Sequence, residues 1–137
     1  MDKLAKLKGV LYTSSIVFVV ILAFFITPIS DDLRSTLFPM VAGAGIIFMI
    51  LGGILIFMSR IQKGRLKFFL ILTGLSAIMP FAGSVLHNVF YALAIVFENL
   101  SFLFEFLHGA FFIAAIVVAP ITFIIGAIGS LIHMKKR

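Results

Sequence analysis

The sequence contains no cysteine and no tryptophan, and only 12% of its 137 residues are charged. Without cysteine, the chain cannot form disulfides, thiolate metal sites or a thiol nucleophile. Water-soluble domains usually have about 25% charged residues, so this chain has too few to cover a surface that faces water. The composition therefore argues against a soluble enzyme, a disordered segment and a nucleic-acid-binding protein.

Long apolar runs take the place of the missing charges. Hydrophobic residues make up 63% of the chain, and the mean hydropathy is +1.28. Four uncharged stretches are long enough to cross the hydrocarbon layer as helices, and none alternates in the manner of barrel strands. We therefore predict an all-α integral membrane protein that forms a single domain over residues 1–137. Its four transmembrane helices should lie at about 10–29, 36–58, 67–86 and 109–132.

The basic residues are distributed unevenly between the two sides of this predicted bundle. Ten of the eleven Lys and Arg residues fall on the side of both termini and of the loop after the second helix, and Arg34 is the exception. Four of the five acidic residues fall on the opposite side, namely Asp31, Asp32, Glu98 and Glu105. Cytoplasmic loops carry the excess of Lys and Arg. We therefore predict a cell-membrane protein with both termini in the cytoplasm, and interpret the first helix as an uncleaved signal anchor.

The segment 87–108 is too apolar for an ordinary loop. As one helix, it would place the following residues within an arc of roughly 100°: His87, Tyr91, Ala94, Glu98, Ser101, Glu105 and His108. A narrow polar stripe on an apolar helix is typical of amphipathic helices. We therefore predict an interfacial or re-entrant helix at about 88–107 on the outer side. A fifth span is the alternative, but it would place the C-terminal basic residues outside.

This stripe also holds the candidates for a cation or metal site. Glu105 and His108 are i, i+3 neighbours that could share one ion, whereas Glu98 lies about 10 Å from Glu105 along the axis. The weak metal-binding candidates are Glu105, His108, Glu98, His87, Asp31 and Asp32. A solvated stripe that faces water or headgroups is the alternative interpretation. The sequence implies no cofactor and identifies no catalytic residue.

Proline and small residues predict some details of helix packing. Pro80 and Pro120 fall within predicted helices and should kink them, whereas Pro39 lies near the start of the second predicted helix, where its missing N–H is harmless. Glycine and alanine in the second and fourth predicted helices permit close approach of helices, within one chain or between two copies.

Three functions remain open at this stage. The membrane-embedded parts of the predicted helices have no Asp, Glu, Lys or Arg, which disfavours coupled transport, and no catalytic motif is found. We therefore expect a non-catalytic accessory or interaction subunit whose partners are the bilayer and another membrane protein or a second copy, and not nucleic acid. The alternatives are a small oligomeric pore or transporter, including a holin-like pore, and an outward-facing cation- or metal-binding membrane protein.

Overall fold

The computed structural model describes residues 3–135, which are helical apart from short turns. The elements are α1 (Lys3–Ile26), α2 (Asp31–Ser59), α3 (Gly64–Val96), the 3₁₀ turn η1 (Glu98–Leu100), α4 (Ser101–Ile113), the π turn η2 (Ala114–Val118) and α5 (Ala119–Lys135). The last four elements follow one another without a break. Asp2, Lys136 and Arg137, which contribute to the predicted charge pattern, lie outside the described residues.

Four helical stretches are long and apolar enough to cross a membrane: Lys3–Ile26, Asp31–Ser59, Gly64–Val96 and Glu98–Lys135. The prediction of an all-helical chain with four helices able to cross a membrane is therefore confirmed. The 24 residues of α1 span about 36 Å, and the 33 residues of α3 span about 50 Å. Since the hydrocarbon layer is about 30 Å thick, α3 exceeds it by about 20 Å.

The second helix begins five residues before its predicted start. The Ser30 side chain caps its N-terminus and accepts a hydrogen bond from the Leu33 N–H at 3.4 Å. Asp31 and Asp32 occupy the first turn, where carboxylates interact favourably with the helix dipole. Pro39 therefore lies inside α2, so the prediction that it sits near the start of this helix was wrong.

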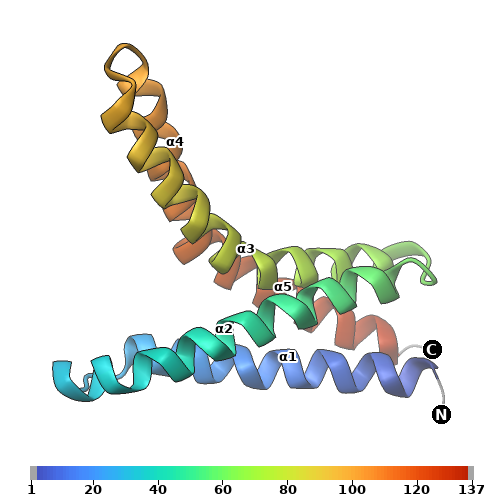
Figure 1. The fold of residues 1–137 in the computed structure, drawn as a ribbon. Coiled ribbons are helices and arrows are strands. Elements are labelled where there is room, and N and C mark those ends of the chain that lie inside the picture. Colours follow the sequence, from blue (N-terminus) through green and yellow to red (C-terminus); the bar gives the residue numbers. More distant parts are fainter. Residues whose placement is uncertain (1–2, 136–137) are drawn as a thin grey trace.

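Helices α1, α2 and α5 and the first part of α3 form a bundle that contains the hydrophobic core (Figure 1). The ring of Phe123 stacks on Phe18 at 4.6 Å and lies 5.0 Å from the ring of Phe48, which joins α5 to α1 and α2. Helices α2 and α3 cross at two glycines. A Cβ atom built on Gly52 would lie 2.6 Å from the Gly74 carbonyl oxygen, so only glycine permits this approach.

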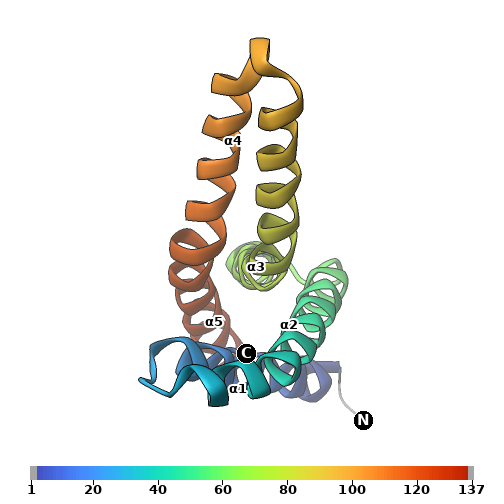
Figure 2. The same ribbon diagram turned by 60° about the vertical axis from the view of Figure 1, so that its left-hand side comes forward.

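The rest of α3 and all of α4 leave the bundle together and form a helical hairpin, which we call the arm (residues 81–113) (Figure 1). Figure 2 shows the two helices of the arm side by side from a second direction. Helix α3 bends where it leaves the bundle, and we attribute the bend to Pro80, which removes one main-chain donor and crowds the preceding turn. Pro120 is the second residue of α5, and the Ala119 N–H before it bonds to the Ala114 carbonyl at the start of η2.

Residues 88–107 do not form one separate helix, contrary to the prediction. Residues up to Val96 continue α3, residues from Ser101 on belong to α4, and Phe97–Leu100 turn the chain back. The third and fourth predicted helices are correspondingly longer than expected, at 64–96 and 98–135. Polar residues three and four positions apart occur both on one continuous helix and on two helices joined by a turn. The spacing of the polar stripe alone therefore did not reveal the turn.

Candidate functional site

One side of the arm is held together by phenylalanine rings. Phe90 on α3 stacks on Phe111 at 5.4 Å, with an interplanar angle of 8°, and lies 6.2 Å from Phe104. Phe97 at the turn lies 6.1 Å from Phe104 as well. Near the bundle, a Cβ atom on Gly83 would lie 2.9 Å from the Ala115 Cβ, so the missing side chain lets α3 approach η2 there. These contacts fix the pairing of α3 with α4.

The other side of the arm contains a pair of histidines. The rings of His87 and His108 are stacked at 3.8 Å with an interplanar angle of 22°. Nδ1 of His87 lies 3.1 Å from the main-chain oxygen of His108, and Nδ1 of His108 lies 3.1 Å from the main-chain oxygen of His87. Because a carbonyl oxygen only accepts, each Nδ1 carries the proton. Both rings are half-buried.

The predicted polar stripe is divided between the two helices of the arm. Tyr91 on α3 lies across from α4, with its ring 5.3 Å from the ring of His108, and Phe112 lies 5.2 Å from His87. Glu105, three residues before His108, is exposed. The structure therefore brings His87, Tyr91 and His108 together, as a contact between two helices.

The carboxylate candidates for a metal site do not join this pair. Asp31 and Asp32 lie in the first turn of α2, at the end of the other hairpin (Figure 1). Within residues 3–135 there is no group of three or more His, Asp or Glu side chains arranged to hold a metal ion. In the same part of the chain, no carboxylate forms an ion pair within 4.0 Å of either arm histidine.

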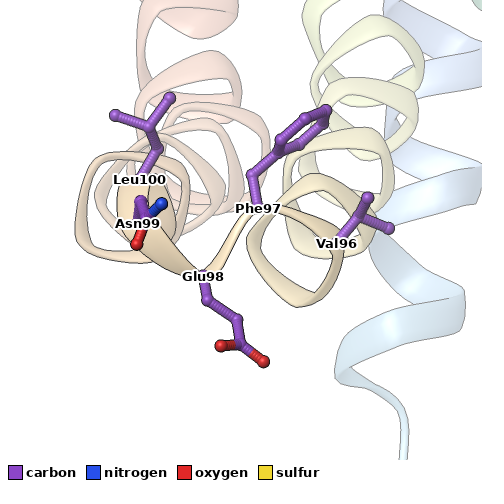
Figure 3. A pocket seen from close by; sticks show the side chains of 5 residues that line it. All are labelled: Val96, Phe97, Glu98, Asn99 and Leu100. Atoms are coloured by element: carbon purple, nitrogen blue, oxygen red, sulfur yellow. The ribbon is translucent and has the colours of Figure 1, made fainter.

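The turn of the arm is open. A shallow depression there is lined by consecutive residues of the turn itself, Val96 to Leu100. Figure 3 shows the Glu98 carboxylate pointing away from the turn, on the opposite side from the Phe97 ring. Both Glu98 and Glu105 are exposed.

Comparison with known proteins found no matching protein family, curated protein or solved structure.

Sequence reasoning missed the pairing of His87 with His108. A usable signal was present, because Glu98 and Asn99 form a short polar step between two apolar stretches, as turns often do. Folding the segment at that step places positions 87 and 108 opposite each other, ten or so residues on either side.

Proposed function

We propose that this protein is a non-catalytic accessory or interaction subunit of a cell membrane, and that its arm binds a membrane-spanning helix of another protein. The observation that carries this proposal is an apolar stripe on the outer side of α4. Phe102, Phe106 and Ile113 are 84%, 66% and 55% exposed. With Gly109 they follow a spacing of four, three and four residues, so all four lie on one face of the helix.

Gly109 gives this stripe the shape of a docking surface. No heavy atom lies within 4 Å of a Cβ atom built on Gly109, so the glycine leaves open space between the larger side chains. Small residues flanked by large ones let two membrane helices approach and interlock, which is the main source of helix association in lipid. The aromatic and histidine contacts between α3 and α4 leave this stripe free for another helix.

Affinity purification of the full chain from its native membrane in a mild detergent tests the proposal. We expect a stoichiometric partner protein, and we expect Gly109→Leu to reduce its recovery about tenfold by filling the space that the partner occupies. Gly53→Leu is the matched control, since Gly53 also has no heavy atom within 4 Å of a built Cβ but lies on α2. Gly53→Leu should retain the partner.

Three results would overturn the proposal. One is a partner that Gly109→Leu retains in full. Another is recovery of only a second copy of this chain, which would mean self-association. The third is ion flux in liposomes that Glu98→Gln/Glu105→Gln abolishes, which would make the protein a pore lined by the arm.

We also propose that the start of α1, at Lys3, and the end of α5, at Lys135, both face the cytoplasm. They lie at one end of the bundle together with the turn between α2 and α3 (Figure 1). That end carries nearly all of the basic residues, and an excess of Lys and Arg is typical of the cytoplasmic side.

A further inference from the structure

An open apolar groove runs between α1 and α2 near the turn that joins them. Its walls include Val20, Ala23 and Phe24 from α1, and Met40 and Ala44 from α2. The groove has a volume of about 540 Å³. The groove lies between two helices that are long and apolar enough to span the membrane. In a membrane, such helices are surrounded by the acyl chains of lipids.

Arg34 stands at the rim of this groove. Its Nη2 donates a hydrogen bond to the main-chain oxygen of Thr27 at 3.4 Å, and its guanidinium carbon lies 5.8 Å from the centre of the Phe24 ring. Both Thr27 and Phe24 line the groove. A guanidinium has five N–H donors in a planar fork that matches a phosphate group, and only one of them is used here.

Two carboxylates lie beside this cation. Asp31 and Asp32 precede Arg34 in the first turn of α2, and both are exposed. No ion pair within 4.0 Å joins either carboxylate to Arg34. The two carboxylates and the guanidinium therefore all remain available to a ligand. The first turn of α2 therefore holds two negative groups and one positive group, and the positive one, Arg34, contacts residues of the groove.

We propose that the groove binds a zwitterionic phospholipid with an ammonium headgroup. One acyl chain lies in the groove, the phosphate accepts hydrogen bonds from the Arg34 guanidinium, and the ammonium group lies near Asp31 and Asp32. This charge pattern selects against anionic phospholipids, whose phosphate would meet Arg34 but whose remaining headgroup would gain nothing from the two carboxylates. The inference concerns the α1–α2 hairpin and is independent of what the arm binds.

Native mass spectrometry of the full chain tests this proposal. The delipidated protein is mixed in a non-ionic detergent with equal amounts of phosphatidylethanolamine, phosphatidylcholine and phosphatidylglycerol. We expect phosphatidylethanolamine to be retained at least about fivefold more than phosphatidylglycerol. It should also be retained more than phosphatidylcholine, whose quaternary ammonium cannot donate hydrogen bonds. Inorganic phosphate alone should not displace it, because the acyl chain contributes to binding.

Paired variants separate the groove from general lipid binding. Arg34→Gln should lower phosphatidylethanolamine retention about tenfold. Arg60→Gln should not, although Arg60 also lies over a ring, 5.4 Å from the centre of Phe57 at the other end of α2. Ala44→Phe fills the groove and should lower retention of all three lipids, whereas Ala42→Phe, at an exposed position outside the groove, should not.

The carboxylates have their own variant. Asp31→Asn/Asp32→Asn should abolish the preference over phosphatidylglycerol while binding persists. Equal retention by wild type, Arg34→Gln and Ala44→Phe would overturn the proposal. So would equal losses in Arg34→Gln and Arg60→Gln, preferential retention of phosphatidylglycerol by the wild type, or displacement of the lipid by inorganic phosphate.

Discussion

His87 and His108 each donate a ring N–H to the main-chain carbonyl of the other, and their rings stack between the two helices of the arm. The arrangement satisfies two donors inside a hairpin that is otherwise held together by apolar rings. It also ties side chains to carbonyl groups that already accept helical hydrogen bonds, which uses the second lone pair of each oxygen.

Replacing either histidine should loosen the arm. His108→Phe keeps a ring for stacking but removes one donor, and we expect it to destabilise the pairing of α3 with α4 by about 1 kcal/mol. His87→Ala removes a donor and the stack, so its effect should be larger. Spin labels on cysteines at positions 88 and 105 report the separation of the helices, since the chain has no cysteine of its own.

His133→Phe is the control for these two variants. His133 bonds to the Gly129 carbonyl of its own helix and lies 5.2 Å from the Phe69 ring, within the bundle. The variant His133→Phe should leave the distance between the two spin labels in the arm unchanged. An unchanged separation in His87→Ala as well would show that the histidine contacts do not hold the arm.

The crossing of α2 and α3 should be sensitive to a single methyl group. Gly52→Ala places a Cβ against the main-chain oxygen of Gly74, which cannot turn away, and should destabilise the bundle by about 1–3 kcal/mol. Gly53→Ala has open space and should stabilise α2 by up to about 1 kcal/mol through helix propensity. Unfolding in mixed micelles measures both, and equal effects would contradict the crossing.

A hydroxyl pair should couple α3 to α5. The Ser76 and Thr122 hydroxyl oxygens lie 2.7 Å apart. A double-mutant cycle with Ser76→Ala and Thr122→Val should give a coupling energy of about 0.6 kcal/mol, the typical value for such pairs in membrane bundles. Ser14→Ala is the control and should not couple to Thr122→Val, because the Ser14 hydroxyl bonds to Val10 of its own helix.

Cysteine labelling tests the proposed orientation. Single cysteines at positions 34 and 98 should react with an impermeant thiol reagent from outside the cell. A cysteine at position 133, in the last turn of α5, should react only after the membrane is opened. Outside labelling at position 133 would reverse the proposed orientation or add a span.

The number of spanning helices was predictable because apolar length is a property of each local stretch of sequence. The end of α1 was also close to expectation, since Pro28 follows it by two residues. The start of α2 was not, because Asp31 and Asp32 resemble a loop until the capping bond of Ser30 is seen.

The site was less predictable than the fold. The stripe identified the relevant residues, His87 and His108 among them, but a helical spacing does not say which positions face a neighbouring helix. Arg34 was noticed only as an exception to the charge pattern. Its place at a groove depends on how Phe24 and Thr27 meet α2, which is a tertiary contact.

The π turn at Ala114–Val118 determines how the arm is rotated relative to the bundle. A π turn holds about one residue more than an α turn, and each residue turns a helix by about 100°. Deleting one residue from this turn would therefore swing His108 away from His87 while Phe123 stayed in the core. At this point the number of residues in the chain, more than their chemistry, aligns the two parts of the molecule.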